Sequence, residues 1–382
     1  MRTITPHLTL AGSVLLAGAA FSQTPADQAR QPFFVQPDLP QVATLYADGS
    51  PIVTEWERIW HGMCSQDRDA LSVRELQDIA AMHDWLMLNG SVVTVDTPRT
   101  AGAGINFVFN VSGGIPSGAL TAIANAEGYL EGLFSDVITV TIDLSFANLG
   151  PGVLGGTSSF YTSATWSTSR TGLINGQDAN DTIEDSLPTG STIPVRYGSS
   201  SSVTNEGTVY WTRANYNSTV GSVSGSAASM QFNNTFTFDY DPANGITSGF
   251  YSFIDVMVHE CGHALGFTSG VDFRIRDIEA LDIYRFQSTD GSGDYNPDTL
   301  AEFQVRARLA AFNKPNDSHN SDLISAEMRM SDGSPYQASH FREQSANIGL
   351  MDPALAPGET WYPAYFATNT DLTMFDAIGY NR

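Results

Sequence analysis

The chain has 382 residues, of which 41 are acidic and 18 are Lys or Arg, so its formal charge is −23. Such a charge argues against nucleic acid and anionic membranes as partners, because binding to either needs cations that neutralise phosphate groups. Only Cys64 and Cys261 are present, which excludes a scaffold held together by several disulfides. The length allows one large domain or two smaller ones.

The first 22 residues have the pattern of a secretory signal peptide. Arg2 supplies a positive charge, and Leu8 to Phe21 form an apolar run that is short for a membrane span. Ala20 and Ser22 are small residues at the −3 and −1 positions of a cleavage site. We therefore expect cleavage near Ser22 and a secreted or periplasmic protein, with a membrane anchor as the alternative. No later run of 18 apolar residues follows, so no membrane partner is expected.

Residues 23–100 form the predicted N-terminal segment, for which a removable pro-region is one interpretation. Residues 23–50, rich in Pro, Gln and Asp, are predicted to be a loose arm. Residues 51–90 are predicted to be mainly helical, because four apolar residues recur at helical spacing: Trp56, Ile59, Trp60 and Met63. Pro98 and nearby glycines then interrupt the pattern, so we place the start of a catalytic domain, 101–382, at this point.

The catalytic domain begins with the pattern of a crossover unit. Ile105 to Val111 is an apolar run typical of a strand, Ser117 to Ser135 has an amphipathic helical pattern, and Val137 to Ala147 alternates between apolar and polar residues. A strand, a helix and a second strand in this order predict an α+β domain with a mixed, twisted sheet.

The rest of the domain has weaker signals. Residues 148–250 are predicted to be loops and short strands, with one strand over 228–238 that could offer an open edge to an extended substrate. Residues 276–286 and 301–312 are predicted to be helices. A last helix near 371–378 is expected to stop at Gly379.

The strongest chemical signal is the sequence His259-Glu260-Cys261-Gly262-His263. Residues i and i+4 share one face of a helix, so both imidazoles can reach one ion, and the intervening Glu is the usual general base of a zinc hydrolase. Ser252 and Asp255 resemble a helix N-cap pair, and Gly266 can end the helix sharply. The alternative is a chance match to a short pattern.

A catalytic zinc site needs three protein ligands and an open position, so a third ligand must come from elsewhere. The remaining histidines after the signal segment are His61, His83, His319 and His340. The carboxylates of Glu279 and Asp282 are rivals, although their spacing does not match that of a thermolysin-like site. They can equally lie on a solvated helix face.

The run Ser339-His340-Phe341, followed by Gly349-Leu350-Met351-Asp352-Pro353, resembles the leishmanolysin-like branch of the metzincin zinc peptidases. The close resemblance covers only 250–267 and 339–353, and the ending 371–380 is similar in character. It implies His340 as the third zinc ligand, Met351 as the methionine of a turn beneath the metal, and protein or peptide as the substrate. In the commonest metzincin spacing the third ligand would fall at Ser269, and serine is a poor zinc ligand, so the chain departs from that version.

Three questions stay open at the level of sequence. Cys64 can form a disulfide with Cys261, remain a free thiol, or block zinc in a zymogen. An acidic loop containing Asp290, Asp294 and Asp298 is a candidate for Ca²⁺ or an ordinary solvated loop. A secreted binding or surface protein that keeps the zinc ligands but has lost catalysis is the alternative to a zinc-dependent endopeptidase.

Overall fold

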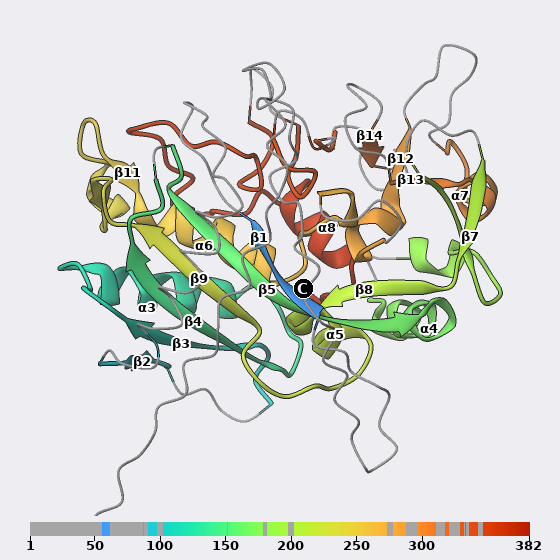
Figure 1. Cartoon of the computed structure of the whole chain (residues 1–382), viewed down its shortest axis with the longest axis horizontal. Helices are drawn as coiled ribbons and strands as arrows, with labels where there is room; N and C mark the ends of the chain where they lie inside the picture. Colours follow the sequence, from blue (N-terminus) through green and yellow to red (C-terminus); the bar gives the residue numbers. More distant parts are fainter. Residues whose placement is uncertain are drawn as a thin grey trace, which may run out of the picture. The chain divides into compact units, whose positions relative to one another are not determined.

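A long mixed sheet with helices on one of its faces organises the part of the chain that the computed structural model describes (Figure 1). All described residues belong to one compact unit, 32–382. No helix among them has the length and apolar character needed to cross a membrane. The described residues are 56–61, 87, 91–97, 102–150, 152–178, 182–197, 202–272, 278–287, 297–310, 318–320, 329–331, 333, 336–342 and 347–382.

The main sheet has seven strands, in the order β1-β5-β9-β4-β3-β2, with β8 paired to β5. Strands β3, β4 and β9 are parallel, whereas β2, β5 and β8 each run antiparallel to their partners. The strands are β1 (Trp56–His61), β2 (Val93–Val95), β3 (Asn106–Ser112), β4 (Thr139–Ala147), β5 (Gly155–Thr165), β8 (Thr208–Thr212) and β9 (Ala228–Asn233).

In the part of the chain that the structure describes, three small sheets lie outside the main one. They consist of β6 (Ile193–Tyr197), β7 (Val203–Glu206) and β13 (Arg308–Ala310); of β10 (Phe238–Asp239) and β11 (Tyr251–Ser252); and of β12 (Arg285–Gln287) and β14 (Ser318–Asn320). Among the described residues the α-helices are α3 (Ala119–Glu131), α4 (Trp166–Gly176), α5 (Arg213–Thr219), α6 (Phe253–Ala264), α7 (Leu300–Val305) and α8 (Asp371–Ala377). Short 3-10 turns cover η1 (Ile183–Ser186), η2 (Pro242–Asn244), η3 (Gly270–Asp272) and η4 (Ala280–Tyr284).

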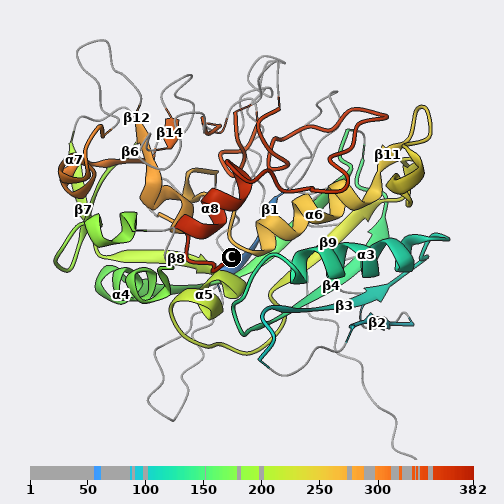
Figure 2. The ribbon, with the colours of Figure 1, turned by 180° about the vertical axis from the view of Figure 1, so that it is seen from behind.

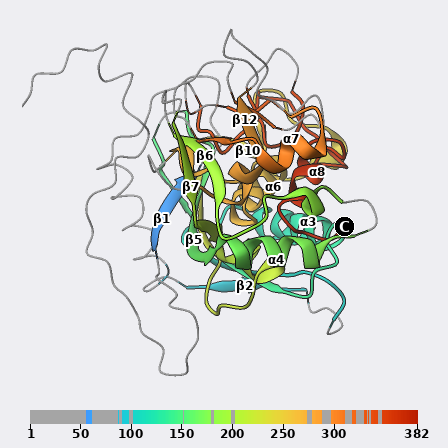
Figure 3. The same cartoon turned by 90° about the vertical axis from the view of Figure 1, so that its right-hand side faces the viewer.

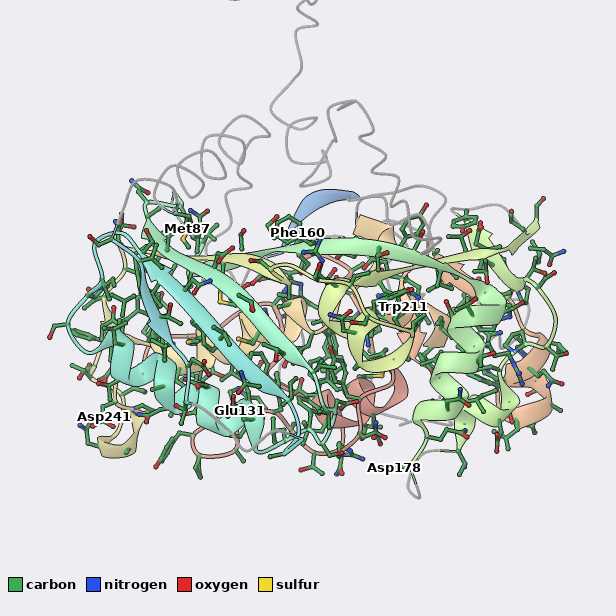
Figure 4. All side chains as sticks on the ribbon, turned by 90° about the horizontal axis from the view of Figure 1, so that it is seen from below. Met87, Glu131, Phe160, Asp178, Trp211 and Asp241 are labelled. Carbon is green, nitrogen blue, oxygen red and sulfur yellow. The ribbon has the colours of Figure 1, made fainter. Side chains whose placement is uncertain are left out.

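The two faces of the sheet differ in polarity. Helices α3 and α6 run across one face, as Figures 2 and 3 show from two directions, and Leu144 and Met230 of neighbouring strands belong to the buried apolar core. The next row across the sheet joins Asp143 to Ser229 and Ser229 to Ser158. Because side chains alternate along a strand, this polar row lies on the opposite face. Phe160, also on that face, is seen away from α3 in Figure 4.

Several predicted elements are confirmed. The strand expected over 105–111 is β3, the helix expected over 117–135 is α3, and the strand expected over 137–147 is β4. Since β3 and β4 are parallel and joined through α3, the crossover unit and the mixed sheet are both present. The last helix is α8, and Gly379 follows it with φ of 101°, the left-handed conformation that ends a helix.

The helical prediction for 51–90 is wrong where the structure describes it as a strand. Trp56–His61 is β1, which pairs antiparallel with β5. Aromatic and β-branched residues favour strands, and pairing with a neighbouring strand overrides a helical spacing in so short a segment. Met63 and most of the remaining N-terminal segment lie outside the described residues, as do the signal segment and the arm over 23–50.

The predicted strand over 228–238 is present as β9, but its expected open edge is wrong. Strand β9 is paired on both sides, with β4 and with β5. The apolar pattern of a strand does not show how many neighbours pair with it, so only the tertiary structure reveals that β9 is central.

The later helical predictions are too long. The expected helix over 276–286 is the 3-10 turn η4 followed by strand β12, and the expected helix over 301–312 is the short α7 followed by β13. Helices α4 and α5 were missed within 148–250. Their N-caps, Thr165 and Thr212, accept hydrogen bonds from backbone N–H groups three residues later, which is a signal that the sequence does carry.

Candidate metal centre

Helix α6 carries the central motif through the interior of the protein. Every residue from Phe253 to Ala264 is buried. Ser252 caps its first turn by accepting from the N–H of Asp255, as predicted. The Asp255 carboxylate accepts from the N–H of Trp361 at 2.6 Å and so ties the start of the helix to the C-terminal region. At the other end, Gly266 has φ of 106°, and the chain turns away.

His259 and His263 are one turn apart on α6, with their Nε2 atoms 3.0 Å from each other. His340 approaches from a loop, and its Nε2 lies 3.2 Å from that of each helical histidine. Among the described residues this is the one group of three side chains close enough together to hold a metal ion, and all three are buried. The structure therefore brings together the three histidines that the sequence singled out.

The outer nitrogen of each ring faces a backbone carbonyl. Nδ1 of His259 lies 2.6 Å from the oxygen of Leu350, and Nδ1 of His263 lies 2.8 Å from that of Phe267. Nδ1 of His340 lies 3.3 Å from the oxygen of Gln337. Since a carbonyl only accepts, each Nδ1 is the protonated nitrogen, which leaves every Nε2 with a lone pair directed at the centre of the group.

This donor set fits a metal ion. Burial lowers the pKa of His259 to about 4, so its imidazole is neutral, as a ligand must be. Three converging lone pairs repel one another unless a cation lies between them. Three corners of a tetrahedron around zinc would be about 3.3 Å apart for Zn–N bonds of about 2.05 Å. The observed separations of 3.0 to 3.2 Å match that spacing closely.

Glu260, next to the first of these histidines, is also fully buried. Its Oε2 accepts a hydrogen bond of 2.8 Å from the hydroxyl of Thr157 on β5. Gly155, two residues earlier on the same strand, allows the close approach: a Cβ there would lie 3.2 Å from Oε1 of Glu260 and 2.9 Å from Val256. The carboxylate is thus held between a helix and the adjacent strand.

A buried Arg285 holds the loop that presents His340. Its guanidinium donates to the carbonyls of Ser331 and Ala338 at 2.8 and 2.7 Å, on either side of the loop. Asp282 pairs with this Arg at 3.1 Å. Because one planar guanidinium donates to both carbonyls, Arg285 fixes the two arms of the loop relative to each other. Asp282 in turn holds Arg285 in place.

The rival third ligands have other partners. Asp282 pairs with Arg285 and accepts from the hydroxyl of Ser269, and Glu279 accepts from Thr268. Ser269 lies at the sequence position of the third ligand in the commonest metzincin spacing. Its hydroxyl donates to Asp282, and its N–H donates to Ser339. Of the other histidines, His61 and His319 lie on β1 and β14, and His83 lies outside the described residues.

Met351 lies against the helix between its two histidines. A Cβ on Gly262 would be 2.5 Å from the Met351 sulfur, so the absent side chain of Gly262 makes room for the thioether. The Met351 carbonyl accepts from the N–H of Phe341, next to His340, at 3.0 Å. The N–H groups of Leu350 and Met351 donate to the carboxylate of Asp371 at 2.8 and 3.0 Å.

Thr157, Arg285 and Asp371 are the supporting residues that the sequence did not reveal. Each acts through a contact with a residue 20 or more positions away in the sequence, and no local sequence pattern predicts such a contact. Asp371 was expected only as the first residue of a helix.

The structure describes only part of the two other candidate features, the cysteine pair and the acidic loop proposed for Ca²⁺. Cys261 is a buried free thiol whose pKa burial raises well above its usual value, so it is held protonated and inert. Cys64, with its proposed pairing and zymogen roles, lies outside the described residues. So do Asp290 and Asp294 of the calcium candidate, while Asp298 is exposed.

Comparison with known proteins finds no match to a family model, a curated protein or a solved structure. The described residues themselves place three buried imidazoles close enough together to hold one metal ion.

Proposed function

We propose that the chain is a secreted zinc-dependent endopeptidase of the metzincin clan, similar to its leishmanolysin-like branch. The observation that carries the proposal is the convergence of three buried imidazole Nε2 atoms, together with a buried Glu260 that follows the first of them in the sequence. The paired motif on α6 supplies two of the rings, and the downstream run that resembles this branch supplies the third, His340.

Zinc is the metal that this donor set favours for hydrolysis. Imidazole nitrogens also suit copper, iron and nickel, but three histidines with an open fourth position are typical of catalytic zinc. When bound by His259, His263 and His340, zinc would act as a Lewis acid that lowers the pKa of a water ligand towards ~7 and polarises a carbonyl. No further ligand is needed from the rival carboxylates.

The Glu260 carboxylate is the proposed general base. It takes a proton from the attacking water while that oxygen adds to the peptide carbonyl carbon, and it returns the proton to the nitrogen of the leaving amine as the C–N bond breaks. Its burial beside apolar residues of α6 excludes bulk water, which strengthens the interactions that hold it. Protein or peptide is the substrate class, and nucleic acid is disfavoured by the charge of −23.

The test is metal analysis together with a casein or peptide-library assay on the wild type and Glu260→Gln. Glutamine has nearly the same shape but cannot accept the proton, so zinc content should stay near normal and activity should fall by about 10²–10⁴-fold. Glu302→Gln, the same change on the exposed helix α7, is the control and should retain activity.

Activity of Glu260→Gln within a few-fold of the wild type would show that Glu260 is not the base. Full zinc occupancy in a wild type that cleaves no peptide would instead favour the zinc-stabilised, catalytically inactive protein.

A further inference from the structure

Strand β5 follows helix α6 along the whole motif. Its alternate residues Gly155, Thr157 and Ser159 face the helix, because Gly155 approaches Val256 and Glu260 while Ser159 Oγ donates to the carbonyl of His263 at 3.3 Å. Thr157 lies between them in register with Met230 of the core. The strand is therefore the wall against which the Glu260 side chain lies.

The Thr157 hydroxyl has two acceptors within reach, both on Glu260. Its Oγ1 lies 2.8 Å from the carboxylate Oε2 and 3.0 Å from the backbone carbonyl oxygen. A hydroxyl has one proton, and a carboxylate is the stronger acceptor, so the shorter contact is the hydrogen bond when Glu260 is ionised. Neither side chain is exposed, so water cannot replace this donor.

Gly155, on the same face of β5 as Thr157, makes room for the carboxylate. A side chain at Gly155 would bring its Cβ to 3.2 Å from Oε1 and 3.3 Å from Cγ of Glu260. The absent side chain at Gly155 thus makes room for Oε1 of Glu260, and the next residue on the same face of β5, Thr157, donates a hydrogen bond to Oε2.

We propose that Thr157 is a positioning residue for the general base: its hydroxyl holds Oε2 of Glu260, which fixes the carboxylate in one orientation. This inference rests on the proposed function. Both acceptors of the Thr157 hydroxyl belong to Glu260, so it acts through that residue.

The experiment compares Thr157→Val, Thr157→Ser and Thr162→Val in the zinc-loaded full chain. Valine keeps the volume of threonine and removes the hydroxyl, so kcat should fall about 10- to 100-fold while KM changes less than about threefold. Serine restores the hydroxyl and should recover kcat to within about threefold of the wild type. Thr162→Val is the matched control on the same strand, since the buried Thr162 hydroxyl has no hydrogen-bond partner among the described residues.

A second readout does not need activity. In a double-mutant cycle of urea unfolding midpoints, Thr157→Val should shift the midpoint of the wild type more than that of a Glu260→Ala background, where only the backbone carbonyl of residue 260 remains as an acceptor. Thr162→Val should give the same shift in both backgrounds. An equal shift of Thr157→Val in both backgrounds overturns the inference.

The outcomes separate the two proposals. A wild type without peptidase activity removes the proposed function, while the cycle still tests the contact. An active wild type whose kcat is unchanged in Thr157→Val overturns the positioning role. If Thr157→Val loses activity only in proportion to its loss of bound zinc, the positioning role is also overturned. The hydroxyl would then support the fold of the metal site and not the orientation of the Glu260 carboxylate.

Discussion

His340 is the residue on which the completeness of the metal site depends. It lies in a loop, and its position comes from the hydrogen bond of its carbonyl with Ser331 and from Arg285, which grips the loop on both sides. Rings on a helix are positioned by the helix itself, but a ring on a loop needs such supports. The loop ligand is thus the one whose identity the sequence left most open.

We predict that His340→Ala lowers zinc affinity by more than about 100-fold, because losing a ligand should cost at least as much as losing a supporting contact. His319→Ala, which changes a rival histidine on β14, should keep zinc. The measurement is competitive zinc titration against a chelator. Normal zinc affinity in His340→Ala would remove His340 from the ligand set.

Met351 supports the site without offering a strong ligand, since a thioether is soft and fills irregular apolar space. Met351→Leu nearly conserves volume and should cost less than about 1.5 kcal/mol with zinc retained. Met351→Asp puts an unpaired charge against buried Gly262 and should lower both zinc occupancy and melting temperature. The check is zinc content with thermal unfolding, and an unaltered Asp variant would contradict a supporting role.

At the scale of elements, helix α8 holds the turn that contains Met351. The carboxylate of Asp371 accepts from the N–H groups of Leu350, Met351 and Ala367. The Leu350 carbonyl in turn faces His259. The first residue of the last helix thereby reaches the metal site through two hydrogen bonds, which explains why the C-terminal region is packed against the motif helix.

Burial raises the pKa of Asp371 to about 7, despite three backbone donors that favour its charged form. The folded state then binds this proton more tightly than the unfolded state, so the contribution of Asp371 to stability falls as pH rises from about 4 to about 7. Asp371→Asn has no titratable carboxyl group at this position, and it replaces one of the two carboxylate oxygens that accept backbone N–H groups. The stability advantage of the zinc-saturated wild type over Asp371→Asn should therefore narrow over this range, by up to about 4 kcal/mol.

Urea unfolding at pH 5, 6 and 7 measures the difference. An advantage that stays constant or widens with pH would mean that the three N–H donors keep Asp371 ionised throughout.

At the scale of the whole molecule, the face of the main sheet opposite α3 and α6 carries a row of polar side chains. The row of Asp143, Ser229 and Ser158 is polar, and the two serine hydroxyls are buried without a hydrogen-bond partner among the described residues. A buried unsatisfied hydroxyl costs about 1–3 kcal/mol, which a permanent interior would avoid with apolar residues. Water that reached these hydroxyls would remove this cost, so we expect uncovering this face to be tolerated.

We predict that a chain starting at Ser91, which lacks β1, stays folded. In this variant the serine hydroxyls on the polar face can form hydrogen bonds with water. The opposite face of the sheet keeps its packing against α3 and α6. Size-exclusion chromatography, zinc content and cooperative thermal unfolding test this. Aggregation or loss of cooperative unfolding would show that the residues before 91 are needed for the rest of the domain to fold.

Local patterns determined much of this protein. His259 and His263 share one face of any helix that contains them, so their spacing alone predicts that they lie together. The strand, helix and strand over 105–147 each have an apolar period of their own, so the sequence alone also predicts the crossover unit. Tertiary structure decided the rest. Strand β1 exists because β5 pairs with it, β9 is central because strands flank both its edges, and His340 reaches the histidines because Arg285 and Asp371 act across long separations. Such contacts join residues with no shared period, so only the folded chain reveals them.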